Sequence, residues 1–220
     1  MFKSSKFWII HEVTAEVRKE EGKIVIKPWL TAIIRKEMSR PTRLALEKGF
    51  IRGKVLDYGC GIGVDTKKLL ELGIDATCFE PYAKESYLYK YLKDLEAKGR
   101  LLTSTENLPN ESFDTILLNY VINVIPNPEE HEKVLKDVYR LLKKDGCVII
   151  AVRSKEEIEH EAKRGGWLKY GDGYVTRKGT FQKGFTPEEL EEKLREVGFT
   201  IIGKLLTEKK GDIIMYACKV

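Results

Sequence analysis

Short apolar runs alternate with stretches of helical spacing from residue 54 to the end of the chain. The apolar runs predict strands at residues 55–58, 76–79, 100–103, 115–120, 147–152, 200–206 and 213–218. The helical spacing predicts helices at residues 65–72, 83–98, 128–143 and 187–197. The early runs are apolar at consecutive positions, as strands covered on both faces by helices require. This alternation predicts an α/β fold with a parallel, doubly wound sheet.

The last two predicted strands are separated by a short polar segment, Glu208-Lys209-Lys210-Gly211-Asp212. No helix is present to carry the chain back across the sheet, so these two strands cannot be joined as a parallel pair. The sequence therefore predicts that an otherwise parallel sheet ends in an antiparallel hairpin.

The first 28 residues follow a different pattern. Two β-rich runs, residues 7–13 and 23–27, flank Glu20-Glu21-Gly22, and this arrangement predicts a small hairpin with its turn at those three residues. Pro28 closes the segment.

Two stretches of helical spacing follow the hairpin, at residues 31–38 and 42–48. Ser39 has the side chain of a helix N-cap, so we predict that the second helix opens near Pro41. Arg40 and Arg43 lie in this helix. They either reach toward a ligand carboxylate or pair with acids on the surface.

Composition limits the class of protein. The 220 residues suit one α/β domain with some decoration, and 42% apolar with 33% charged residues is typical of a folded chain. No apolar run approaches the ~18 residues of a membrane span, and the N-terminus lacks a signal peptide pattern, so we expect a cytoplasmic protein without membrane contact. Charge is dominated by Lys and Glu, and Gln182 is the only glutamine. That bias is typical of heat-adapted proteins.

Cysteine and histidine positions give no sign of a metal site. The four cysteines include no C-x-x-C pair, and the three histidines share no ligand-like spacing. We therefore expect no bound metal, and we expect the cysteines to be buried free thiols in a reducing compartment.

A glycine-rich loop follows the first predicted strand of the sheet. Residues 55–65 have Asp57 two positions before Gly59, and the glycines continue as G-x-G-x-G through Gly61 and Gly63. Glycines at a strand-to-helix turn allow positive φ angles and a close approach of a ligand to the backbone. The third glycine of a dinucleotide fingerprint would fall on Val64 instead. The loop therefore favours a nucleotide-like ligand other than NAD.

An acid ends the second predicted strand. Glu80 lies 17 residues after Gly63 and is followed by Pro81. A carboxylate at this position can accept hydrogen bonds from both hydroxyls of a ribose. The alternative is a solvated loop carboxylate.

These features resemble class I S-adenosylmethionine (SAM)-dependent methyltransferases, with residues 55–65 as motif I. The resemblance implies a Rossmann-like seven-stranded sheet, SAM as cofactor and S-adenosylhomocysteine as product. It assigns the cofactor to ten residues: Asp57, Gly59, Cys60, Gly61, Gly63, Glu80, Pro81, Thr105, Glu106 and Asn119. Residues 105–109 followed by Phe113-Asp114 resemble the adenine-binding stretch, although Ser104 stands where many relatives have aspartate.

A narrower resemblance is to the methyltransferase family associated with DNA phosphorothioation systems. It rests on residues 39–46, 55–65, 119–125 and 172–183. The last segment is absent from generic methyltransferases. This resemblance implies a DNA or DNA-modification partner.

The segment before the last helix, residues 153–185, is the predicted substrate lid. Between residues 163 and 184 it holds one acid, Asp172, and six basic residues, Lys163, Arg164, Lys169, Arg177, Lys178 and Lys183. This segment therefore has an excess of five positive charges, which equals the net charge of +5 of the whole chain. Trp167, Tyr170, Tyr174 and Phe181 are interleaved with these charges. The pattern fits either a groove for DNA or RNA or a solvated basic loop anchored by its aromatics.

Methyl transfer depends mainly on positioning the acceptor behind the sulfonium methyl. The chain lacks the D/N/S-P-P-Y/F tetrad of amino methyltransferases of DNA bases, since Tyr120-Val121 follows Asn119. Cys60 lies in the cofactor loop, which gives no support to the cysteine mechanism of cytosine methylation. The residues that we assign to acceptor positioning and catalysis are Tyr120, Asn123, Arg153, Tyr174 and Arg177.

Together these patterns predict an N-terminal extension, residues 1–40, and a SAM-binding methyltransferase domain, residues 41–220, with the lid insert near 153–185. The expected function is a SAM-dependent methyltransferase acting on nucleic acid or on an intermediate of its modification. Two alternatives stay open: a small-molecule methyltransferase, and a non-catalytic SAM-binding partner that regulates a DNA-modification system.

Overall fold

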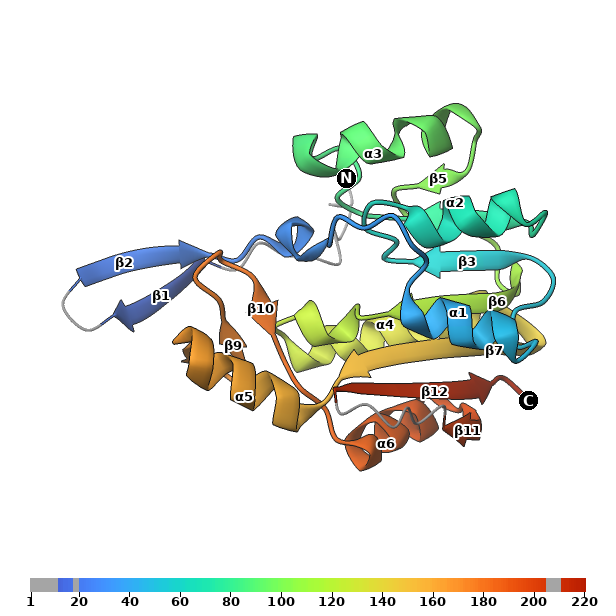
Figure 1. The fold of residues 1–220 in the computed structure, drawn as a ribbon. Coiled ribbons are helices and arrows are strands. Elements are labelled where there is room, and N and C mark those ends of the chain that lie inside the picture. The colour runs from blue at the N-terminus through green and yellow to red at the C-terminus, as the bar shows by residue number, and fades with distance from the viewer. Residues whose placement is uncertain (1–11, 18–19, 205–210) are drawn as a thin grey trace.

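The computed structural model describes residues 12–17, 20–204 and 211–220, and its main feature is a seven-stranded sheet (Figure 1). The strand order is β11-β12-β7-β6-β3-β4-β5. The strands are β3 (Val55–Tyr58), β4 (Ala76–Phe79), β5 (Leu101–Leu102), β6 (Phe113–Asn119), β7 (Leu142–Arg153), β11 (Thr200–Lys204) and β12 (Asp212–Cys218). All pairs from β5 to β7 are parallel, whereas β12 runs antiparallel to both β7 and β11. The predicted fold class is confirmed.

Helices cover both faces of this sheet. They are α1 (Arg40–Glu47), α2 (Val64–Glu71), α3 (Ser86–Ala97), α4 (Pro128–Leu141), α5 (Lys155–Gly165) and α6 (Pro187–Val197), with short 3-10 turns η1 (Pro28–Thr31) and η2 (Ile122–Val124). In β6, Ile116 and Leu118 pack with α4 and α6, while Leu117 between them packs with α1 and α2 on the other face. This alternation explains why the central strands are apolar at consecutive positions.

The N-terminal hairpin forms, but its predicted turn is wrong. Strand β1 (Glu12–Val17) pairs antiparallel with β2 (Glu20–Val25), so Glu20-Glu21-Gly22 lies inside β2 opposite residues 15–17. The start of the predicted first run, residues 7–11, lies outside the described residues. The two apolar runs are compatible with a turn at residues 20–22 or with a turn before residue 20. The sequence alone therefore did not determine the register of this ribbon.

The helix predicted at residues 31–38 is absent, whereas the helix capped by Ser39 is confirmed. After η1 the chain is irregular up to Ser39. We call residues 28–39 the strap. Its polar groups bond to distant residues, including Tyr87, whose hydroxyl donates to the Ala32 carbonyl at 3.1 Å. These tertiary contacts replace the helical hydrogen bonds that the spacing predicted.

The insert of residues 153–185 folds into α5 and a small antiparallel sheet, β10-β9-β8, with strands β8 (Leu168–Tyr170), β9 (Gly173–Val175) and β10 (Phe181–Gln182). It lies beside the end of the N-terminal ribbon (Figure 1). Ile26 packs with Val175 and Phe181, and the Lys27 amide donates to the Gly179 carbonyl at 2.8 Å. The insert and the N-terminal extension therefore share a small core.

The four cysteines form two disulfides, so the prediction of free thiols is wrong. Cys147 and Cys218 are register partners on β7 and β12, with Cα atoms 4.0 Å apart. Cys60 follows β3 and is bonded to Cys78 on the neighbouring strand β4, with Cα atoms 5.7 Å apart. Both pairs result from strand neighbours that are distant in sequence, which spacing rules do not detect.

Candidate cofactor and acceptor site

A cavity of about 640 Å³ opens at the carboxyl ends of the parallel strands. Parallel sheets bind ligands at this edge, where the loops after adjacent strands diverge. One wall follows β3 and β4, a second follows β6 and β7, and the strap closes the cavity over both. The residues on its surface include Trp29, Arg35, Arg40, Asp57, Gly59, Cys60, Gly61, Glu80, Pro81, Asn119, Tyr120, Asn123, Arg153, Glu157, Gln182 and Asp212.

The glycine loop has the conformation that its sequence predicts. Gly59, Gly61 and Gly63 all have positive φ, at 75°, 57° and 75°. A Cβ on Gly61 would lie 3.2 Å from the Ala32 Cβ of the strap, so a side chain there would meet the far wall of the cavity. Gly63 does not line the cavity. It precedes α2, and a Cβ there would lie 2.7 Å from Leu95, which makes Gly63 a packing residue.

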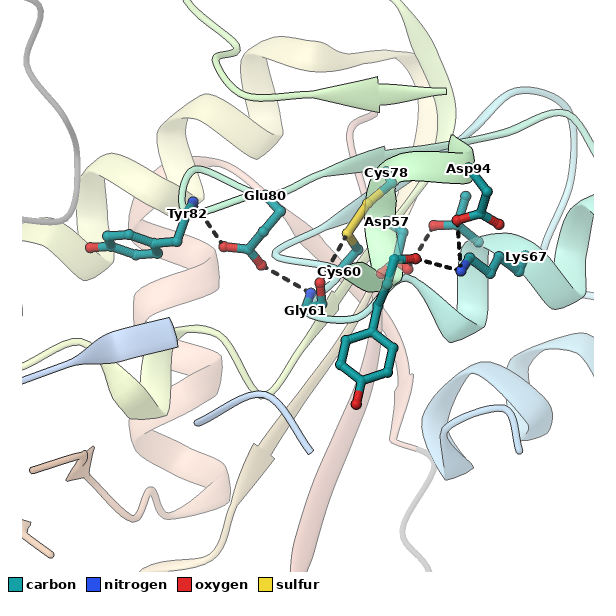
Figure 2. The surroundings of a disulfide bond; sticks show 10 residues. Asp57, Cys60, Gly61, Lys67, Cys78, Glu80, Tyr82 and Asp94 are labelled. Carbon is teal, nitrogen blue, oxygen red and sulfur yellow. Dashed lines mark hydrogen bonds and ion pairs between the residues drawn. A yellow bond between two sulfur atoms is a disulfide. The ribbon is translucent and has the colours of Figure 1, made fainter. Parts of the chain in front are cut away.

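Glu80 is buried between the glycine loop and the start of the next segment (Figure 2). Its Oε2 accepts from the Gly61 amide at 2.9 Å, and its Oε1 accepts from the Tyr82 amide at 3.1 Å. Burial raises the pKa of Glu80 from 4.5 to about 7, against the opposing effect of these two hydrogen bonds. Each oxygen keeps a lone pair, so the carboxylate can still accept from two hydroxyls.

Asp57, in β3 just before the glycine loop, links the strand to the helix that follows the loop. It is buried, and its Oδ2 accepts from the Thr66 hydroxyl at 2.9 Å, which ties β3 to α2. Burial and the nearby Asp65 carboxylate raise the pKa of Asp57 from 3.8 to about 7. Asp57 also reaches the cavity surface.

Asp65 holds the strap against the cofactor loop, a role that the sequence analysis missed. It is buried in the first turn of α2. Its carboxylate accepts from Arg35 Nη1 at 2.8 Å, from the Ser39 amide and hydroxyl at 2.7 and 2.5 Å, and from the Thr42 hydroxyl at 2.9 Å. The available signal was an acid at the start of a helix, which normally indicates only dipole stabilisation.

Tyr120 lies on the acceptor side of the cavity in an unusual conformation. Its φ of 59° is in the left-handed region, which non-glycine residues adopt at a cost of about 1–3 kcal/mol and often at functional sites. Burial, together with the nearby Asp212 carboxylate, raises the pKa of Tyr120 above its usual range. Arg40 Nη1 lies 3.7 Å from the same carboxylate. Arg40 thus reaches the cavity, whereas Arg43 pairs with Glu47 on the surface.

Two asparagines present carbonyl oxygens that lack a protein partner among the described residues. Asn119 donates through Nδ2 to the Thr42 hydroxyl at 2.8 Å, but its Oδ1 is buried without a donor. Asn123 is 1% exposed, and its Oδ1 is also without a donor. The Lys183 amide donates to the Asn123 backbone carbonyl at 2.8 Å, so β10 of the insert holds η2 in place. Gln182, next to it, is a further cavity residue that the sequence analysis missed.

Arg153 also lines the cavity, but its charge is compensated. Its Nη1 and Nη2 donate to Glu161 Oε2 and Oε1 at 3.0 and 2.9 Å. Its Nη2 also lies 3.1 Å from Glu157 Oε1. Glu157 is itself on the cavity surface.

Four further predicted site residues lie away from this cavity. Thr105 and Glu106 line a smaller hollow with Asp137 and Arg140, and the Thr105 hydroxyl donates to Asp137 at 2.7 Å. Tyr174 lies on β9 with Lys169 Nζ 4.5 Å from its ring centre, and Arg177 follows in the loop to β10. The adenine role of Thr105 and Glu106 and the acceptor role of Tyr174 and Arg177 stay predictions.

Part of the positive charge of residues 163–184 is compensated by ion pairs in the folded protein. Lys183 is buried and paired with Asp172 and Glu189. Phe181 is fully buried, with Tyr170 edge-on against it at 6.3 Å between ring centres. Phe181 and Tyr170 belong to the core of the small sheet, as the interpretation of a loop anchored by its aromatics expects.

The cofactor-side residues fit an adenosyl ligand with an amino-acid end. The buried Glu80 carboxylate has lone pairs left to accept from ribose hydroxyls. Gly61 has no side chain, so it leaves space that a Cβ would fill. The Asn119 Oδ1, which has no donor among the described residues, suits an ammonium group. Within the described parts of the chain, no three His, Cys, Asp or Glu side chains are grouped to hold a metal ion. No helix in those parts is long and apolar enough to cross a bilayer.

Sequence comparison matches residues 30–204 to the family described as methyltransferase domain. The rat mitochondrial ubiquinone biosynthesis O-methyltransferase is 26% identical over 158 residues, which are 67% of this chain and 44% of the relative. Mouse arsenite methyltransferase is 30% identical over 110 residues, which are 42% of this chain and 28% of the relative. The matched segments span less than half of these two curated relatives.

Solved structures share the fold. A Burkholderia thailandensis 1,6-didemethyltoxoflavin-N1-methyltransferase with bound 1,6-didemethyltoxoflavin and S-adenosylhomocysteine gives a TM-score of 0.60 at 22% identity, covering 82% of this chain and 76% of that one. The Pyrococcus horikoshii protein PH0226 gives 0.67 at 18% identity, covering 81% and 87%. At these identities the likeness concerns the fold.

Proposed function

The chain belongs to the methyltransferase domain family, and from this we propose that it transfers the methyl group of SAM to a small molecule bound in the same cavity. One observation carries the proposal. A single space of about 640 Å³ is bordered on one side by the predicted cofactor residues and on the other by Tyr120, Asn123 and Arg153, and the strap closes over it. Pockets of this size enclose small ligands.

The cofactor side would hold SAM through three contacts. Glu80 accepts from the ribose hydroxyls, the loop at Gly59 and Gly61 lets the backbone approach the ligand, and Asn119 Oδ1 accepts from the ammonium group. SAM supplies a methyl group already activated on a sulfonium, so the protein mainly positions the acceptor.

On the acceptor side, the Asp212 carboxylate is near enough to the hydroxyl of Tyr120 to orient it as a hydrogen-bond acceptor. The oxygen of Tyr120 then keeps its lone pairs for an N–H or O–H of the acceptor. The named relatives support a small acceptor, because their names refer to a ubiquinone precursor pathway, arsenite and a didemethyltoxoflavin.

A nucleic acid acceptor receives less support from the geometry. Phe181 is buried in the core of the insert, and Lys183 is buried and ion-paired with Asp172 and Glu189, so neither is available to phosphates or bases. The narrower relation to phosphorothioation-associated proteins stays a prediction from the sequence.

The acceptor class is tested by incubating the protein with methyl-labelled SAM and, separately, with DNA, RNA and a metabolite extract. We expect label in the small-molecule fraction alone. Label in DNA or RNA would overturn the proposal, and no label in any fraction would favour the non-catalytic SAM-binding alternative. The Gly61→Val protein serves as the blank.

Replacing Tyr120 with phenylalanine should lower turnover at least tenfold, since it removes the hydroxyl that Asp212 orients. Affinity for S-adenosylhomocysteine should stay within twofold, because Glu80 and the glycine loop lie on the opposite wall and the side chain of Asn119 is unchanged. Single-turnover rates with the labelled metabolite pool and calorimetric titration measure the two quantities. Equal losses in both would show that Tyr120 holds the cavity together rather than the acceptor.

The double change Arg177→Ala and Lys178→Ala separates the two acceptor classes. Arg177 and Lys178 lie outside the cavity lining, so cofactor affinity and methylation of a small molecule should both be unchanged. Methylation of a nucleic acid would fall severalfold, since two phosphate contacts would be lost. The same labelled assay at two salt concentrations gives the result.

The two buried carboxyls predict opposite pH trends for folding and for binding. Because the pKa values of Glu80 and Asp57 rise to about 7, the folded protein binds more protons than the unfolded chain between about pH 4 and 7. The contribution of these two groups to the stability of the unliganded protein is therefore largest below their usual pKa values and is lost as the pH rises from about 4 to 7. Affinity for S-adenosylhomocysteine should instead increase as the pH rises through 7, as Glu80 becomes ionised and accepts more strongly.

Urea unfolding and calorimetric titration at pH 5.5, 7 and 8.5 measure these trends. In the control Glu80→Gln, the side chain does not titrate, so the pH dependence of affinity should flatten. A Glu80→Gln protein with the pH profile of the natural one would contradict the assignment.

A further inference from the structure

The Cys60–Cys78 disulfide joins the two halves of the cofactor site (Figure 2). Cys60 lies between the two cavity-lining glycines, Gly59 and Gly61, and itself lines the cavity. Cys78 lies in β4, two residues before Glu80. The hydrogen bond from the Gly61 amide to Glu80 Oε2, at 2.9 Å, spans the same two segments. A covalent link therefore controls the separation of the loop and the carboxylate that together hold the ligand.

We propose that Cys60–Cys78 is a redox modification site that sets the affinity for SAM, with the disulfide as the binding form. This inference rests on the assignment of the cavity to SAM. Two thiols need more room than a disulfide, because nonbonded heavy atoms keep a separation of ~3.5–4.0 Å.

The extra room has to come from the loop. Cys78 is fully buried in a cluster with Leu88, Leu92 and Leu95, and packed interiors have little free volume. Cys60 is 7% exposed and has the cavity on its other side. Reduction therefore moves Cys60 toward the cavity and draws the Gly61 amide away from Glu80, and it also frees a segment that the bond had constrained.

The reductant is a dithiol, and its route passes through the ligand site. One thiolate attacks Cys60 Sγ from the cavity, forms a mixed disulfide and displaces Cys78 as a thiolate, which takes up a proton. The second thiol of the reagent then attacks the mixed disulfide and releases Cys60 as a thiol. The dithiol loses two electrons and two protons and ends as a cyclic disulfide. A bound ligand would block the first step.

The chain offers a matched control in its second disulfide. Cys147–Cys218 joins β7 to β12 and does not line the cavity. Its reduction should affect stability without changing the cofactor loop, and bound ligand should not alter its rate of reduction.

The test uses the full chain, S-adenosylhomocysteine and dithiothreitol. Alkylation followed by peptide mass mapping gives the redox state of each cysteine pair, and calorimetric titration gives affinity. We expect affinity to fall about tenfold when Cys60–Cys78 is reduced and to recover on reoxidation. Saturating S-adenosylhomocysteine should slow reduction of this pair at least tenfold and leave Cys147–Cys218 unaffected.

Two double variants keep the result interpretable. Cys60→Ser with Cys78→Ser should bind weakly whether or not dithiothreitol is present, whereas Cys147→Ser with Cys218→Ser should retain the full response. Equal affinity of the oxidised and reduced forms, absence of ligand protection, or free thiols at 60 and 78 in the air-oxidised protein would each overturn the proposal. Absence of binding in every redox state would instead overturn the SAM site itself.

Discussion

Gly61→Val is expected to abolish measurable binding of S-adenosylhomocysteine, with a loss of at least ~100-fold in affinity. Gly61 has a φ of 57°, where a β-branched residue is strained, and a Cβ there would lie only 3.2 Å from the Cβ of Ala32 in the strap. The two methyl groups of valine would then occupy the space of the ligand. The displaced backbone would also turn its amide away from Glu80. Calorimetric titration measures the loss.

A matched control separates backbone strain from occlusion of the site. Gly49 has a similar φ of 69°, but a Cβ there would meet nothing within 4 Å. Gly49→Val should therefore lower the melting temperature by a few degrees and leave affinity unchanged. Thermal melts of both variants show whether the fold is intact. Wild-type affinity in Gly61→Val would remove the basis for placing SAM in this cavity.

Asp65→Ala should produce the largest loss of stability among single changes near the site. The substitution leaves the Arg35 guanidinium and the Ser39 amide and hydroxyl without their common acceptor. Removing one partner of a buried, charged network costs about 3–5 kcal/mol. For a chain of this length, that corresponds to a melting temperature lower by about 10 °C. The strap should also become sensitive to proteases, because its main attachment is lost.

Two comparisons define the origin of that loss. Asp65→Asn keeps an acceptor oxygen for Ser39, so it should lose only the part due to the charge pair with Arg35. Asp75→Ala removes an exposed partner of Arg100 and should change stability by less than about 1 kcal/mol. An Asp65→Ala protein as stable as the natural one would contradict the strap attachment described here.

Elements that depend on local patterns agree with the sequence predictions. The strands Val55–Tyr58 and Ala76–Phe79 and the helix Pro187–Val197 have the predicted boundaries. Apolar runs and capping residues such as Ser39 and Thr186 act over a few neighbouring residues, so their effect is readable without the fold. The glycine loop and Glu80 are also predictable from local sequence, because each directly follows a predicted strand.

The acceptor side of the cavity could not be predicted as a whole. Arg40 and Asp212 come from opposite ends of the described chain and meet only because the strap leads into α1 beside the sheet and β12 runs antiparallel to β7. The sequence predicts Tyr120, Asn123 and Arg153 as site residues because they lie at or just after the ends of β6 and β7. The basic and aromatic character of residues 163–184 predicts Tyr174 and Arg177 as site residues, but that segment forms a separate sheet, and both residues lie outside the cavity lining.

The sequence by itself determined the sheet, most of the helices and the cofactor loop, because periodicity, caps and glycine turns are local properties of the chain. Only the tertiary structure decided the irregular course of residues 32–38, the disulfide partners and the four-donor role of Asp65. In each of these cases the deciding interaction is with residues distant in sequence, on which local propensity has no bearing.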